Sequence, residues 1–177
     1  MMRTVFSPLP DSVFASGSEY KINTDFRVWI QISEIIANES LSEYDRLLSV
    51  LILAFKSKIP DNPIDAIKAL MIFFSKGGEK GTSRPVIDFR VDEGLIYAAF
   101  MQQYGIDLYK ADLHWWKFRE LLNALGEDCM LTRIIGYRSA RPSEIPDKKH
   151  RAFVQKMKNR YSLKHQLSSA EIAAAFE

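Results

Sequence analysis

Residues 88–125 read DFRVDEGLIYAAFMQQYGIDLYKADLHWWKFRELLNAL and contain two apolar helical patterns joined by a turn at 104–108. The first pattern, over 95–101, is apolar on nearly every side, which is typical of a helix in the middle of a fold. In the second, large apolar side chains recur at the spacing of one helix face: Trp115, Phe118, Leu121 and Leu122. Gly105 is expected to end the first helix, and Asp112 to cap the second. We expect this stretch to form the centre of the fold.

Three further helix starts precede this stretch. For the first, the stretch 23–25 (Asn-Thr-Asp) offers several N-cap candidates, with the helix expected from about Asp25. Ser42 and Asn62 mark the other two, and all three stand before apolar residues at helical spacing. Before them, two short extended segments flank a turn containing Gly17 and indicate a small β-hairpin at 12–22. A lone hairpin is marginal in water, so it must pack on another element.

Beyond residue 125, the pattern predicts a short helix around 130–135 and a basic helix that starts at Asp147. The predicted fold class is therefore mainly α, with about seven helices around one core and a small N-terminal β-hairpin. We expect a single helical domain over 1–163, with a flexible loop at 79–87. Residues 164–177 are expected to form a tail or a short helix.

The composition is that of an ordinary globular protein, 47% hydrophobic and 26% charged. The longest apolar runs are far shorter than the roughly 20 residues of a membrane span, and the N-terminus lacks the apolar region of a secretion signal. The single cysteine, Cys129, cannot form an intramolecular disulfide. We therefore expect a reducing cytoplasm and no membrane partner.

The positive charge is confined to one region. Residues 1–129 hold 14 Lys and Arg against 18 Asp and Glu, whereas residues 130–167 hold 10 Lys and Arg against two acidic residues. In the basic helix, Lys148, Arg151 and Lys158 are expected to lie opposite its apolar stripe. The favoured interpretation is a solvated amphipathic helix, followed by a surface for an acidic protein partner, and then by a phosphate-binding surface for nucleic acid.

No pattern in the sequence indicates catalysis. His114 falls on the apolar face of its expected helix, where a packed, hydrogen-bonded role is the better interpretation than a metal ligand. The chain has neither Cys/His pairs at zinc spacing, nor a phosphate-binding glycine motif, nor a nucleophile elbow. Cys129 stands among apolar residues, so we expect it to be buried and inert. We expect no enzyme, no catalytic residue, no metal site and no cofactor.

Trp116 does not lie on the helix face that is predicted to form the core. Adjacent residues on a helix point about 100° apart, so Trp116 lies with Leu113 on a different face from Trp115. A second helix packed over Leu113 and Trp116 is the favoured interpretation. The alternative is a binding site for a protein partner, because tryptophan is over-represented among residues that dominate interfaces.

The chain resembles a family of tailed-phage proteins encoded just upstream of the tape-measure gene and regarded as tail assembly chaperones. The matching motifs are LIYAAF at 95–100, YGIDL at 104–108, LHWWKF at 113–118 and IIGYR at 134–138. LPDS at 9–12, INTDFR at 22–27 and the MKxxY pattern at 157–161 also match. The resemblance extends over most of the chain, to about residue 163.

This resemblance implies a non-enzymatic helper in tail assembly that binds the tape-measure protein, keeps it soluble and gives way as tail-tube subunits polymerise. It also implies a location in the host bacterial cytoplasm and absence from the mature virion. The tail-tube protein and a second copy of the chain are further candidate partners. Two alternatives remain open: a structural or connector component of the virion, and a nucleic-acid-binding accessory protein that uses the basic helix at 148–160.

Overall fold

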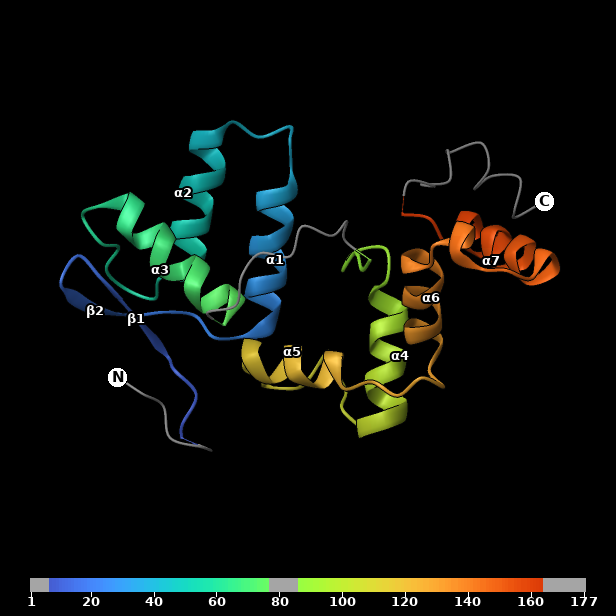
Figure 1. The fold of residues 1–177 in the computed structure, drawn as a ribbon. Coiled ribbons are helices and arrows are strands. Elements are labelled where there is room, and N and C mark those ends of the chain that lie inside the picture. Colours follow the sequence, from blue (N-terminus) through green and yellow to red (C-terminus); the bar gives the residue numbers. More distant parts are fainter. Residues whose placement is uncertain (1–6, 77–85, 164–177) are drawn as a thin grey trace, which may run out of the picture. The chain divides into compact units, whose positions relative to one another are not determined.

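The computed structural model describes residues 7–76 and 86–163, and these residues form a mainly α-helical protein (Figure 1). Their strands are β1 (Ser12–Ala15) and β2 (Ser18–Lys21). Their helices are α1 (Phe26–Ala37), α2 (Glu43–Ala54), α3 (Pro63–Ser75), α4 (Glu93–Tyr104), α5 (Trp115–Asn123), α6 (Met130–Ser139) and α7 (Lys148–Arg160), with a 3-10 turn, η1 (Pro142–Glu144). The predicted fold class, mainly α with an N-terminal hairpin, is confirmed. The predicted tail at 164–177 and most of the predicted loop at 79–87 lie outside the described residues.

The helix starts are set by side-chain caps. The Asp25 carboxylate accepts the backbone N–H of Arg27, the Ser42 hydroxyl accepts that of Asp45, and the Asn62 amide oxygen accepts that of Ile64. Each bond satisfies an N–H that has no partner within its own helix. The three caps predicted from the sequence are thus confirmed.

The hairpin has the turn that its sequence favours. Ser16 and Gly17 both have positive φ, 48° and 78°, as the tightest hairpin turns require. Val13 and Ala15 are buried while Phe14 between them is exposed, which is the alternation of a strand with one covered face. Strand β1 packs on α3, so the hairpin has the partner element that a lone hairpin needs.

The contacts divide the chain into two compact units, each described here by itself. Unit 1 comprises residues 1–82 and 110–123, and unit 2 comprises 83–109 and 124–177. The two helices of the stretch 88–125 therefore belong to different units, α4 to unit 2 and α5 to unit 1. That both units combine into the single domain predicted over 1–163 stays a prediction.

The core of unit 1 is a cluster of stacked aromatic rings. Trp29 of α1 is fully buried, and its ring lies 4.8 Å from that of Phe73 and 6.5 Å from that of Trp115. Phe26 stacks on Phe118 at 4.7 Å, which joins α1 to α5. Ring pairs at such distances add roughly 0.5–1.5 kcal/mol beyond the burial of their area. The core therefore fixes α1, α3 and α5 together.

In unit 2, α6 packs against both α4 and α7. Its buried side chains, Leu131 and Ile134, face a single side of α4, where Ile96 and Phe100 are also buried. Although α4 is apolar on nearly every side, Met101 is 39% exposed, so α4 buries one face and not its whole circumference. None of the helices in the described ranges is long and apolar enough to span a bilayer.

Candidate partner-binding site

An apolar groove in unit 1 lies between β1 with the residues before it, α3 with its C-terminal end, and Trp116 of α5. Its volume is about 410 Å³, within the range of small-ligand and side-chain sites. Phe14 from β1 and Ile72 from α3, exposed by 71% and 64%, stand at the groove, and the Trp116 ring lines it. The remaining lining residues are Pro10, Ser12, Val13, Ala69, Phe73 and Lys76. Exposed large apolar residues grouped at a concave surface indicate a binding site for an apolar partner.

Trp115 and Trp116 cap the C-terminal end of α3, which is one side of the groove. The Trp115 indole N–H donates to the Phe74 carbonyl at 3.0 Å, and the Trp116 indole N–H donates to the Phe73 carbonyl at 2.7 Å. Arg119 also donates to the Phe74 carbonyl. The last four carbonyls of a helix lack partners inside it, so α5 satisfies two of these acceptors. The polar edge of Trp116 is therefore structural, while its ring is left to line the groove.

His114 links two parts of the groove wall. Its Nδ1 accepts the backbone N–H of Trp116 at 3.0 Å, and its Nε2 lies 2.9 Å from the carbonyl oxygen of Pro10. Since Nδ1 is the acceptor, the neutral ring carries its proton on Nε2 and donates it to Pro10. The predicted hydrogen-bonded role of His114 is confirmed. It is half-buried at the start of α5, a capping position that the sequence assigned to Asp112.

A charged pair borders the groove. The Lys76 ammonium lies 5.8 Å from the Trp116 ring centroid and forms an ion pair with Glu120 of α5. The hydrogen bond from Lys76 holds the pKa of the Glu120 carboxyl below its ordinary value, and the charge of Lys76 acts in the same direction. Both groups are largely exposed, so this pair orients the Lys76 side chain more than it stabilises the unit.

This pair gives a testable pH dependence. The substitution Lys76→Gln should raise the pKa of Glu120 towards its ordinary value of 4.5, because the cation that favours the carboxylate is removed. A lowered pKa means that the pair contributes its stability above the ordinary pKa and loses it as the pH falls through the folded value. The measurement is an NMR titration of the Glu120 carboxyl carbon, with Lys68→Gln on the same helix as control. Equal titration of Glu120 in all three proteins would show that the pair does not form.

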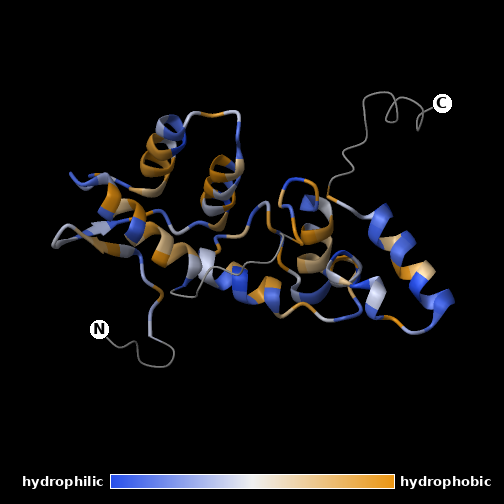
Figure 2. Ribbon diagram, turned by 45° about the horizontal axis from the view of Figure 1, so that its top comes forward, coloured by the Kyte–Doolittle hydropathy of each residue, from blue (hydrophilic) through white to orange (hydrophobic). Residues whose placement is uncertain are grey.

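Unit 2 presents the basic helix α7, which Figure 2 colours hydrophilic along most of its length. Arg151 donates to the carbonyls of Ile145 and Pro146, and Lys158 donates to that of Ala140. These two predicted site residues therefore hold the turn before α7 in place. Lys148 is exposed, and no ion pair within the described ranges uses it. The three cations thus differ in role, although their spacing made them look equivalent.

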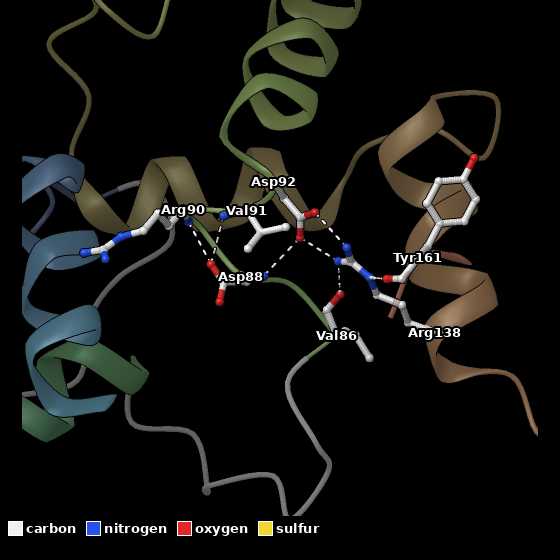
Figure 3. Close-up of polar contacts among 7 residues, drawn as sticks. All are labelled: Val86, Asp88, Arg90, Val91, Asp92, Arg138 and Tyr161. Carbon is white, nitrogen blue, oxygen red and sulfur yellow. Dashed lines mark hydrogen bonds and ion pairs between the residues drawn. The ribbon is translucent and has the colours of Figure 1, made fainter. Parts of the chain in front are cut away.

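A buried ion pair holds α7 and α4 to α6 (Figure 3). Asp92, 1% exposed, accepts two hydrogen bonds from the Arg138 guanidinium, at 2.6 and 2.8 Å, and a third from the backbone N–H of Asp88. Arg138 also donates to the carbonyls of Val86 and Tyr161. Asp92 stands at the N-cap position of α4, but its side chain makes no cap hydrogen bond. The sequence reasoning missed this pair, because its members are 46 positions apart.

Leu113 is buried, but it does not share a helix face with Trp116 as the helical wheel predicted. It is 4% exposed, and its carbonyl accepts the backbone N–H of Phe26 at 3.0 Å. The wheel failed because α5 begins only at Trp115, so Leu113 lies in the extended segment that pairs with the start of α1. Trp116 and Leu113 are therefore not one surface patch. The role of the five candidate residues in binding a partner stays a prediction.

No group of three or more His, Cys, Asp or Glu side chains in residues 7–76 and 86–163 is placed to hold a metal ion. Cys129 is buried, as predicted, and its sulfur accepts the backbone N–H of Thr132 as the cap of α6. What the arrangement offers is an apolar groove on one unit and a cationic helix on the other.

These features define a mainly α-helical protein whose described surfaces suit the binding of another chain. The model of the family described as Bacteriophage Gp15 protein matches residues 5–163, and the chain therefore belongs to that family. Membership places it among bacteriophage proteins with a structural or assembly-related role. Among curated proteins and among solved structures, none matches the chain.

Proposed function

We propose that this protein is a tail assembly chaperone that binds the tape-measure protein of its phage and keeps it soluble until the tail tube forms around it. The observation that carries the proposal is the apolar groove of unit 1, with Phe14 and Ile72 exposed beside Trp116. Membership of a bacteriophage family and the resemblance of the LHWWKF and YGIDL motifs to tail assembly chaperones support it.

The groove suits one face of an amphipathic helix. A long helical protein exposes apolar side chains at every third or fourth position, and these aggregate unless another surface covers them. Helix-in-groove recognition buries such anchors in pockets lined by apolar side chains. Val13, Ala69 and Phe73 supply the apolar wall, and Lys76 at the margin can meet an acidic residue of the bound helix. The proposal assigns the protein no reaction and no cofactor.

The same geometry suits a temporary complex. The groove has a volume of about 410 Å³, so it offers room for only a few side chains. Affinity depends on how many apolar side chains of the bound helix are fully desolvated. One small groove can cover only a few of them, so we expect moderate affinity for each segment of the tape-measure protein. Moderate binding allows the tail-tube protein to displace the chaperone as polymerisation proceeds.

Co-expression with the tape-measure protein tests this proposal. We expect the soluble fraction of the tape-measure protein to rise severalfold when the full chain is present, and the two proteins to co-purify. An unrelated helical protein of similar size serves as the control for general effects of co-expression. If the tape-measure protein is equally insoluble in both cultures, the proposal is wrong.

The location of the protein after assembly is a separate test. A chaperone that is displaced during tube formation is expected in the host cytoplasm and absent from purified virions. Quantitative mass spectrometry of mature particles measures this directly. Stoichiometric recovery in the particle would favour a structural or connector component instead.

A further inference from the structure

Helix α2 carries an exposed apolar row that the groove does not include. Tyr44, Leu48 and Ile52 are spaced four residues apart, so they lie along one face, and they are 70%, 40% and 60% exposed. The chain that leads into this face is acidic: residues 34–46 hold four carboxylates (Glu34, Glu39, Glu43, Asp45) and one cation, Arg46. Unit 1 thus presents an apolar row with negative charge at one end.

Helix α7 carries the complementary pattern. Lys149, Phe153, Lys156 and Arg160 follow at steps of four, three and four, the spacing of a single helix face. Phe153 is 49% exposed, and α7 contains six Lys or Arg residues and no acidic residue. No ion pair in residues 7–76 and 86–163 engages Lys149 or Lys156. This face of α7 thus presents an aromatic ring flanked by lysines that form no ion pair in the described residues.

We propose that the α2 face of one copy of this protein packs against the α7 face of a second copy, so that the protein associates head to tail. The apolar row Tyr44–Leu48–Ile52 meets Phe153, and the acidic residues beside α2 meet the cations of α7. Two α7 faces repel each other, and two acidic α2 ends do the same, which disfavours a symmetric dimer. Because the two faces differ, each bound copy leaves one face open, and association continues into chains or closes into rings.

The exposed row of α2 favours this partner over nucleic acid. Cations beside an aromatic ring also suit single-stranded nucleic acid, whose bases stack on such rings, but nucleic acid offers no counterpart to the apolar and acidic α2 face. An amphipathic helix with carboxylates at one end matches both the ring and the charges. The faces are small, so we expect self-association that is weak, with a dissociation constant in roughly the micromolar range or above, and sensitive to salt.

Sedimentation velocity of the full chain tests the proposal. The average mass should rise with protein concentration and fall between about 0.05 M and about 0.5 M salt, because charge pairs at an interface rim are screened. Ile52→Asp, in α2, and Phe153→Asp with Lys156→Glu, in α7, should each weaken association at least about tenfold. The matched control is Ile64→Asp, which changes an isoleucine of 64% exposure on α3 and should associate as the parent does.

A mixture of the α2 variant and the α7 variant tests the head-to-tail arrangement most directly. The α2 variant keeps a functional α7 face and the α7 variant keeps a functional α2 face, so a mixture should form one-to-one dimers that cannot grow. A protein that stays monomeric at every concentration, or a mixture that stays monomeric, overturns the proposal. Monomeric protein that binds an oligonucleotide and loses that binding on Lys156→Glu would identify α7 as a nucleic-acid surface instead.

Discussion

Replacing Arg138 by alanine is expected to lower the free energy of unfolding of unit 2 by about 3–5 kcal/mol, the usual cost of leaving one member of a buried ion pair without its partner. Arg138 and Asp92 are 8% and 1% exposed in their side chains, so water cannot replace the lost bonds. Arg138 also binds the carbonyls of Val86 and Tyr161, which brings the segment before α4 and the end of α7 to α6. Denaturant unfolding measures the loss, and hydrogen exchange should show it in α4, α6 and α7.

Two further variants isolate the ion pair. Arg141→Ala removes an arginine whose pairing with Glu144 is exposed, so it should cost less than about 0.5 kcal/mol. The double variant Asp92→Ala/Arg138→Ala should cost less than the sum of the single variants, because each single variant leaves a buried charge without its partner and the double variant leaves none. Additive costs in this cycle would contradict a direct ion pair between the two residues.

Trp115→Ala is expected to lower the free energy of unfolding of unit 1 by about 3–5 kcal/mol, the range for truncation of a large aromatic in a core. The side chain is 2% exposed, stacks on Phe74 at 5.2 Å and on Phe118 at 6.0 Å, and donates to the Phe74 carbonyl. Its removal leaves a cavity next to Trp29, and the Phe74 carbonyl keeps only its hydrogen bond from Arg119. Thermal unfolding followed by tryptophan fluorescence measures the effect.

A substitution of Trp116 measures the contribution of an indole hydrogen bond to stability without truncating the core. Trp116→Phe keeps an aromatic ring at the groove but removes the indole donor, so the Phe73 carbonyl loses one of its partners. We expect a cost of about 1–2 kcal/mol, well below that of Trp115→Ala. A neutral effect of Trp116→Phe would show that the end of α3 does not depend on this hydrogen bond.

Local signals in the sequence predicted much of the fold. Asp25, Ser42 and Asn62 cap their helices as expected, since an N-cap depends only on the two or three residues that follow it. The hairpin was likewise predictable from the turn at Gly17. These features involve neighbours in the chain, and sequence patterns describe such neighbours well.

Features that join distant residues were not predictable in this way. Asp92 precedes a helix, as many capping residues do, but its partner Arg138 becomes visible only in the folded unit. The helical wheel placed Leu113 on one face with Trp116 because it began α5 two residues too early, and helix boundaries are the least reliable part of a prediction from sequence. The groove was not predicted either, since its lining residues are up to 106 positions apart in the chain, from Pro10 before β1 to Trp116 of α5.

The central claim is that the groove of unit 1 binds the tape-measure protein, and a matched pair of substitutions on α3 tests it most directly. Ile72 lines the groove and Ile64 does not, although both are 64% exposed isoleucines of the same helix. Binding of the purified full chain to a soluble tape-measure fragment can be followed by isothermal titration calorimetry. We expect Ile72→Ser to weaken binding at least about tenfold and Ile64→Ser to leave it nearly unchanged. Equal affinity of the two variants, or no binding by the parent protein, would contradict it.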